Sequence, residues 1–311
     1  MPLPRTTGLA TRALLLCVLV VPSCNGGHAA VAPPAFDAAR AWHDLEAIVA
    51  LGPRPAGSEA LERTRQLLER ELAAAGLAPV REAFRAPTPV GELDLVNVYA
   101  DLPGVEGATD TVILAAHYDT KRLSVPFVGA NDGGSAPAVL LELARVLASG
   151  PRRPVAYRFL FLDGEESQRE EWADPDNRYG SRHHAAKLAA EGRARRVRAL
   201  VLLDMVGDKD LCLWRESWSD RRLYEIVAGA ARSLGFGKHV GCTSQPVEDD
   251  HQSFLAVGIP SIDLIDFEYG PRNGWWHTSE DTLDKCSAES LGIVGRIVLA
   301  ALPGIESWTG R

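Results

Sequence analysis

The sequence lacks several features that mark common classes of protein. Its 33 Lys and Arg residues are outnumbered by 41 Asp and Glu residues and form no basic tract, so we expect no nucleic-acid partner. The five cysteines form no CxxC pair, which argues against a thiolate metal site and a disulfide framework. No internal repeat or low-complexity segment stands out. With 311 residues, 46% of them hydrophobic, the chain suits one large globular domain with an ample core.

The amino terminus lacks a hydrophobic run long enough to span a bilayer. Ala13–Val21 is an apolar run of about nine residues that follows Arg5 and Arg12, which is typical of a signal-peptide core. We therefore expect residues 1–24 to be a signal peptide, 25–35 a tether and 36–311 a single catalytic domain of an exported protein. Val21 to Cys24 resembles a bacterial lipoprotein cleavage box, which would lipidate Cys24 and attach a periplasmic or outer-membrane protein to its membrane. The alternative is ordinary cleavage near Ala29 and secretion.

Three cysteines remain after this segment, and their number is odd. Cys212, Cys242 and Cys286 allow one disulfide and one free thiol, and the sequence does not choose the pair.

Apolar runs and helical patterns alternate from residue 111 onward. This alternation predicts an α/β fold with a mostly parallel sheet and helices on both faces. Two further strands are expected at 80–85 and 93–100, and helices at 59–75 and 287–302, among others. The later expected strands are 112–116, the run ending at 159–162, 199–203 and 261–265, and a short helix is expected to start near Asp249.

The strand expected at Phe159–Leu162 ends in Asp163, Gly164, Glu165 and Glu166. Open α/β sheets place their ligand sites at the carboxyl ends of strands, where adjacent carboxylates repel unless a cation or a proton intervenes. A solvated acidic turn is the alternative for this pair taken alone.

Other acids and histidines also follow predicted strands or precede predicted helices. Each has an ordinary explanation as a helix cap or a structural histidine. Together they indicate a catalytic site for zinc or a similar divalent ion, because carboxylates and imidazoles without cysteine suit such ions. The set comprises His117, Asp119, Asp132, Glu165, Glu166, Asp204, Asp249, Asp250, His251 and His277.

The order of these motifs resembles the glutaminyl-peptide cyclotransferases and, more broadly, the zinc aminopeptidases that share their fold. The matching segments cover nearly all of the chain after residue 50 and include AAHYDTK (115–121), GANDGGS (129–135), FLDGEES (161–167), LLDMVG (202–207), EDDHQSF (248–254) and WWHTSEDTLD (275–284). The resemblance implies a central mixed, mainly parallel sheet. It also implies conversion of an N-terminal glutamine of peptides or proteins to pyroglutamate, with release of ammonia, by a protein that holds one zinc ion. We expect a monomer, although the sequence itself does not report the oligomeric state.

The resemblance also implies a role for each matched residue. Asp132, Glu166 and His277 would bind the zinc, and Glu165 would transfer protons. The other assignments make Asp204 and Asp249 two buried carboxylates beside the metal, Trp276 an aromatic wall of the substrate pocket, and Trp172 a second wall in a loop one residue longer than the family pattern.

Two other functions use nearly the same residues. A two-zinc aminopeptidase would bind its second ion with His117 and Asp204, bridge both ions with Asp132, and use Glu165 to activate water for peptide cleavage. The cyclase is favoured by Trp276 beside His277 and by the Asp249–His251 motif. A ligand-binding lipoprotein without catalysis is the third alternative, and an intact Glu165 argues against it.

Overall fold

The computed structural model of the protein describes residues 1–4 and 35–308. The chain divides into two compact units at Pro33 and Pro34, and the second unit is described by itself. Apart from its first four residues, the expected signal peptide lies outside the described residues, as does nearly all of the tether. Export, lipidation of Cys24 and the domain boundaries therefore stay predictions.

Six strands form one mixed sheet in the order β1-β2-β4-β3-β5-β6. β1 pairs antiparallel with β2, and β2 with β4, whereas the pairings of β4 with β3, β3 with β5 and β5 with β6 are parallel. The prediction of a mixed, mainly parallel sheet is thus confirmed. The strands are β1 (Pro79–Thr88), β2 (Gly91–Leu102), β3 (Thr111–His117), β4 (Ala156–Leu162), β5 (Val197–Asp204) and β6 (Ser261–Ile265).

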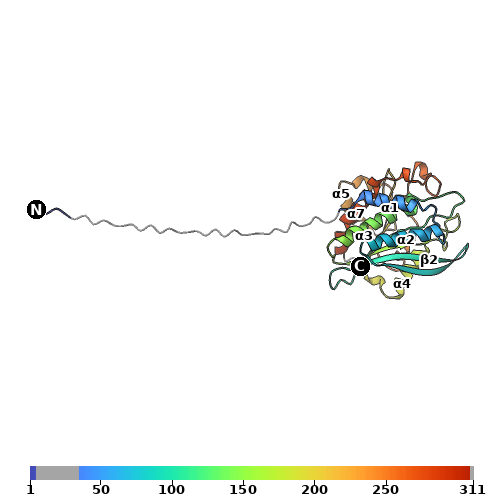
Figure 1. Ribbon diagram of the computed structural model, residues 1–311, viewed down its shortest axis with the longest axis horizontal. Helices are drawn as coiled ribbons and strands as arrows, with labels where there is room; N and C mark the ends of the chain where they lie inside the picture. Colours follow the sequence, from blue (N-terminus) through green and yellow to red (C-terminus); the bar gives the residue numbers. More distant parts are fainter. Residues whose placement is uncertain (5–34, 309–311) are drawn as a thin grey trace. The chain divides into compact units, whose positions relative to one another are not determined.

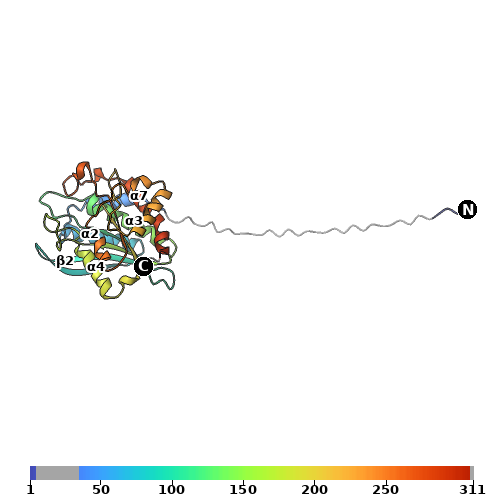
Figure 2. The same ribbon diagram turned by 180° about the vertical axis from the view of Figure 1, so that it is seen from behind.

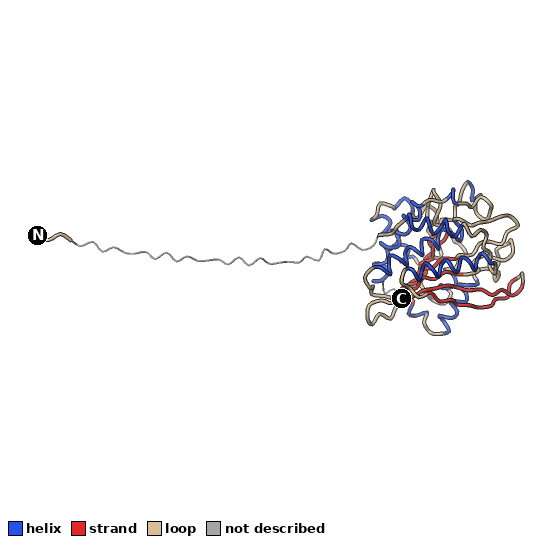
Figure 3. Tube along the Cα trace, in the orientation of Figure 1, coloured by secondary structure: helices blue, strands red, loops and turns tan. Residues whose placement is uncertain are grey.

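Helices cover both faces of the sheet, as predicted (Figures 1 and 2). Alternate residues of a strand point to opposite faces, so β3 sends Leu114 into one apolar cluster and Ala115 into another. The larger cluster lies under α1 (Ala38–Val49), α2 (Glu59–Ala74), α3 (Ala136–Ser149), α5 (Arg221–Ser233) and α7 (Ala288–Ser307). The smaller one lies under α4 (Tyr179–Ala190) and α6 (His251–Leu255). Figure 3 shows the strands as one layer among these helices.

The helices and strands expected from the sequence are present, with small differences in where they begin and end. The largest difference is at the end of α7. The sequence predicted that this helix ends at Leu302, but it continues through Pro303 to Ser307. The extra turn is held because Ile305 is fully buried in the core, while the Glu306 carboxylate accepts hydrogen bonds from Arg153 and Tyr157. α7 is long and apolar enough to cross a membrane, yet 61% of its most apolar window is buried, as in a core helix.

The structure resolves the choice among the three later cysteines. Cys212 and Cys242 form a disulfide, and Cys286 is a buried free thiol.

Candidate active site

A cavity of about 280 Å³ opens beside the carboxyl ends of β4, β5 and β6. Acids and a histidine form its base, and aromatic and aliphatic side chains form its walls. Every residue predicted as a metal ligand, proton-transfer group or aromatic wall of the cyclase lines it, and His117 packs behind Asp132 and Asp204. The lining residues are Asp132, Glu165, Glu166, Trp172, Asp204, Pro246, Val247, Glu248, Asp249, Ile265, Phe267, Trp276 and His277.

Asp132 lies in a tight turn, Asn131–Ser135, that leads into α3. Gly133 follows with φ of 73°, and a Cβ atom there would lie 2.1 Å from the Asp119 carbonyl oxygen, so only glycine fits. The Asp281 carboxylate accepts hydrogen bonds from the backbone N–H groups of Asn131 (2.8 Å) and Asp132 (3.1 Å). These contacts fix the direction of the Asp132 side chain.

Glu165 and Glu166 lie in the loop that follows β4, and Asp119 holds this loop. The Asp119 carboxylate accepts hydrogen bonds from the backbone N–H of Glu165 (3.1 Å) and of Glu166 (3.3 Å). Asp119 was grouped with the metal candidates in the sequence, and the structure gives it this positioning contact. The loop thereby points both glutamates toward the cavity.

Asp132, Glu166 and His277 form a compact group whose ligand atoms all lie within 4.8 Å of one another. His277 Nε2 is 2.9 Å from Glu166 Oε1 and 3.1 Å from Asp132 Oδ2. The other oxygen of Glu166 is buried without a hydrogen-bond partner in the described part of the chain. An imidazole and two carboxylates, one with an unsatisfied buried oxygen, fit a divalent zinc ion that would leave a coordination position open.

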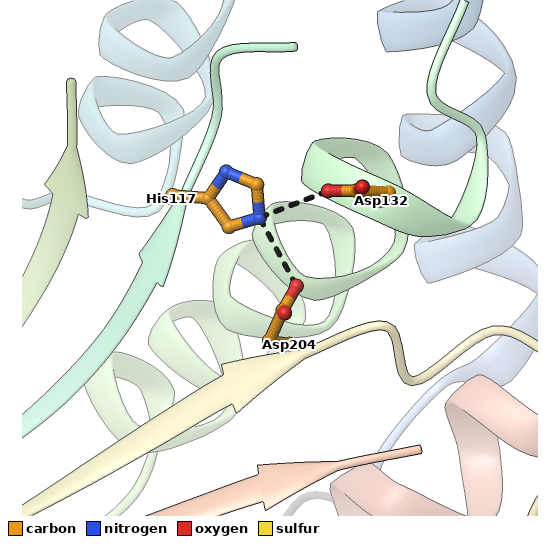
Figure 4. Close-up of side chains that lie close together, drawn as sticks. All are labelled: His117, Asp132 and Asp204. Carbon is orange, nitrogen blue, oxygen red and sulfur yellow. Dashed lines mark hydrogen bonds and ion pairs between the residues drawn. The ribbon is translucent and has the colours of Figure 1, made fainter. Parts of the chain in front are cut away.

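His117, Asp132 and Asp204 form a second group of the same kind (Figure 4). His117 Nε2 is 3.0 Å from Asp204 Oδ1 and 3.4 Å from Asp132 Oδ1, and both acids come from elements that meet the end of β3. Burial raises the pKa of Asp204 to about 7, although His117 opposes the shift. Asp132 is shared by both groups, as an aminopeptidase would require.

Glu165 is buried beside these groups and makes no hydrogen bond through its carboxylate in the described residues. Its Oε2 lies 3.9 Å from His117 Nδ1. Burial raises the pKa of Glu165 well above its usual range; His117 opposes the shift, and the carboxylates of Glu166 and Asp249 add to it. A carboxyl group that accepts and releases a proton near neutral pH needs such surroundings.

Asp249 and His251, both in the set predicted from the sequence, lie in a buried network with two acids that the sequence reasoning missed, Asp263 and Glu216. Asp249, His251 and Asp263 have ligand-type atoms within 4.8 Å of one another, and His251 Nε2 is 3.2 Å from Glu216 Oε2. Burial raises the pKa of Asp263 well above its usual range, and Asp249 adds to the shift. A detectable signal existed for Asp263 alone, because it is an acid inside the apolar strand Ser261–Ile265.

Aromatic rings wall the cavity. The Trp276 ring stacks on the His277 ring with centroids 3.9 Å apart, and Phe267 meets Trp276 edge-on at 5.1 Å. Trp172 also lines the cavity, and its indole N–H donates to the Glu248 carboxylate at 2.8 Å. Phe267 and Glu248 were not singled out from the sequence, since each lies in a loop whose path depends on distant contacts.

The sequence profile of Peptidase family M28 matches residues 97–302. A glutaminyl-peptide cyclotransferase-like protein of Mus musculus is 34% identical over 258 residues, which cover 74% of this chain and 66% of the mouse protein. The crystal structure of an Acidobacteriales bacterium glutaminyl cyclase is 35% identical, with a TM-score of 0.84 over 89% of this chain and 97% of that one. These matches confirm the resemblance seen in the motifs.

Some similar structures are described as peptidases and not as cyclases. A Zn-dependent exopeptidase from Parabacteroides distasonis is 27% identical, with a TM-score of 0.77 over 89% of this chain and 100% of that one. The same fold therefore occurs in proteins described as cyclases and in proteins described as peptidases.

Proposed function

Because this chain belongs to Peptidase family M28 and to the glutaminyl-peptide cyclotransferases, we propose that it converts the N-terminal glutamine of peptides or proteins to pyroglutamate and releases ammonia. The observation that carries the proposal is a single small cavity. It places the Asp132–Glu166–His277 group, the unbonded Glu165 carboxylate and a tryptophan wall around one space of about 280 Å³. Such a space suits a single glutamine folded back on itself.

We assign the metal site to Asp132, Glu166 and His277, and we propose that it holds one zinc ion. When bound, zinc would act as a Lewis acid that stabilises negative charge on the oxygen of the glutamine side-chain carboxamide.

The reaction is an attack of the substrate's α-amine on the carbon of its own side-chain carboxamide. Glu165 takes a proton from the attacking amine as the new C–N bond forms. It then gives that proton to the departing nitrogen as the old C–N bond breaks, so that ammonia leaves and Glu165 returns to its starting state. Both reacting groups belong to one residue, so holding that residue bent supplies much of the acceleration.

Two further sets of side chains support this step. Asp204 lines the same cavity as Glu165, and burial raises its pKa to about 7; His117 opposes the shift, and the Asp249 carboxylate adds to it. The rings of Trp276 and Trp172 hold the apolar part of the bent glutamine and keep water from the cavity.

An aminopeptidase is the second candidate, and the His117–Asp132–Asp204 group specifically favours it. That group would bind a second zinc ion, with Asp132 between the two ions, and Glu165 would activate water against the backbone carbonyl.

A single experiment separates the two candidates. The purified protein is incubated with amidated peptides that begin with Gln, Leu or Ala, and the products are weighed by mass spectrometry. We expect the Gln peptide to lose the mass of one ammonia with its peptide bonds intact, and the other two to be unchanged. Free Leu or Ala, with no ammonia from the Gln peptide, would replace the cyclase with the aminopeptidase.

We also propose that the protein is exported by residues 1–24 and acts as a monomer. Attachment of Cys24 to lipid predicts that a Cys24→Ala variant moves from the membrane fraction to the soluble fraction. An unchanged distribution would favour cleavage near Ala29.

A further inference from the structure

We propose that Glu248 makes the enzyme prefer substrates with a positively charged side chain directly after the N-terminal glutamine. The inference rests on the proposed cyclase function, and it names the class of substrate that the same cavity takes most readily.

The exposure of the cavity's lining residues shows which end faces solvent. The acids at the base, including Asp132, Glu165 and Asp249, are buried, whereas Pro246 and Glu248 are exposed. Among the lining side chains, Glu248 is the one that is both charged and exposed. It therefore places a negative charge at the mouth.

The Glu248 carboxylate is held in place but not neutralised. Its Oε2 accepts the indole N–H of Trp172 at 2.8 Å, a contact between residues 76 positions apart. In the part of the chain that the structure describes, it pairs with no Lys, Arg or His side chain. Lys121 lies 5.8 Å from the Trp172 ring centre, but its ammonium is buried and donates to Ser167. The negative charge of Glu248 is therefore available to pair with a positively charged group of a ligand.

The reaction fixes which part of a substrate passes this charge. The glutamine side chain and α-amine must lie at the base, between Glu165 and the metal group, so the rest of the peptide leaves through the mouth. The second residue is then the first to pass Glu248 and Trp172. A Lys or Arg there meets the Glu248 carboxylate, and an Asp or Glu meets a like charge.

The expected preference is modest, because the mouth is solvated. An exposed ion pair is worth roughly a two- to fivefold change in binding, so attraction of Lys and a repulsion of Glu of similar size together predict about a four- to 25-fold higher kcat/KM for Lys than for Glu. High salt should reduce the ratio, since it screens exposed charges.

The test measures ammonia release from three amidated peptides, Gln-Lys-Ala, Gln-Ala-Ala and Gln-Glu-Ala, at low and high salt. Glu248→Gln removes the charge but keeps an oxygen that can accept the Trp172 N–H. Glu106→Gln is the matched control, because Glu106 is exposed in the loop before β3, at the end of that strand opposite the cavity.

We expect the Lys-over-Glu ratio of kcat/KM to fall to near one in Glu248→Gln and to stay at the wild-type value in Glu106→Gln. Equal rates for all three peptides in the wild type, or an unchanged ratio in Glu248→Gln, would overturn the inference and leave the cyclase in place. Absence of ammonia release from every peptide would instead refute the proposed function, and this inference with it.

Discussion

Replacement of Glu165 with Gln should separate catalysis from stability. The substitution keeps the shape of the side chain and removes its capacity to carry a proton. In the described residues the Glu165 carboxylate makes no hydrogen bond, and its nearest charged partner, His117 Nδ1, is 3.9 Å away. The carboxylates of Glu166 and Asp249 lie close enough to disfavour its ionised form. We therefore expect the substitution to have little effect on the stability of the folded protein.

The two expected magnitudes differ widely. General acid–base catalysis contributes about 10²–10⁴ in rate, so turnover should fall by that factor, or roughly 3–5 kcal/mol in activation free energy. The free energy of unfolding should stay within about 1 kcal/mol of the wild type or rise, because the folded state no longer has to bury an ionisable carboxyl group beside two other carboxylates. Zinc content should not change, since Asp132, Glu166 and His277 are intact.

The assay combines three measurements on one preparation: ammonia release from a Gln peptide, zinc by elemental analysis, and thermal unfolding. Glu106→Gln again serves as the control for a Glu-to-Gln change far from the cavity. Turnover within about threefold of the wild type would remove Glu165 from the mechanism. If the variant lost zinc together with activity, Glu165 would be needed for metal binding, and its role in proton transfer would not be supported.

The remaining predictions concern the metal and the buried network. Chelation should abolish activity and added zinc should restore it, and His277→Ala should reproduce the chelated state; full zinc content with full activity in that variant would contradict the ligand assignment. Burial raises the pKa of Glu216, but the contact of its carboxylate with His251 Nε2 at 3.2 Å and hydrogen bonds from the Trp218 N–H and the Ser219 hydroxyl outweigh this effect and lower the pKa to about 2. Its stabilisation is therefore present above the unfolded pKa of about 4.3 and lost as pH falls toward 2. Glu216→Gln should cost up to about 3 kcal/mol in urea unfolding at pH 7 and about half of that at pH 3; an equal cost at both pH values would contradict the pairing.

The parts of the site that follow buried strands could be placed from the sequence. Phe159–Leu162 is apolar throughout, which predicts a buried strand. Glu165 and Glu166 follow this strand, so they were predicted to lie at the carboxyl edge of the sheet. The same reasoning placed His117 and Asp204 at the ends of β3 and β5. Parallel strands bring their carboxyl ends together, and this is why residues 87 positions apart in sequence lie within 3.0 Å.

The mouth of the cavity could not be placed in this way. Trp172 lies in a loop without regular structure, and its contact with Glu248 depends on a second loop 76 residues later. Neither loop has a regular hydrophobic period from which its buried face could be predicted. The resemblance suggested Trp172 as a wall, but the partner of its indole N–H could come only from the fold.

The position of His277 shows how a distant carboxylate supports the proposed metal group of Asp132, Glu166 and His277. His277 has φ of 53°, a left-handed conformation that costs an L residue roughly 1–2 kcal/mol, so surrounding contacts must hold it there. Asp281 supplies such contacts. It binds the backbone of the Asp132 turn and also accepts the hydroxyl of Tyr269 at 2.9 Å, while the Tyr269 carbonyl accepts the N–H of Trp275. One buried carboxylate thus connects the turn that carries Asp132 with the loop that carries His277. Because these segments are about 150 residues apart, no local pattern could reveal the connection, yet the arrangement of Asp132 and His277 depends on it.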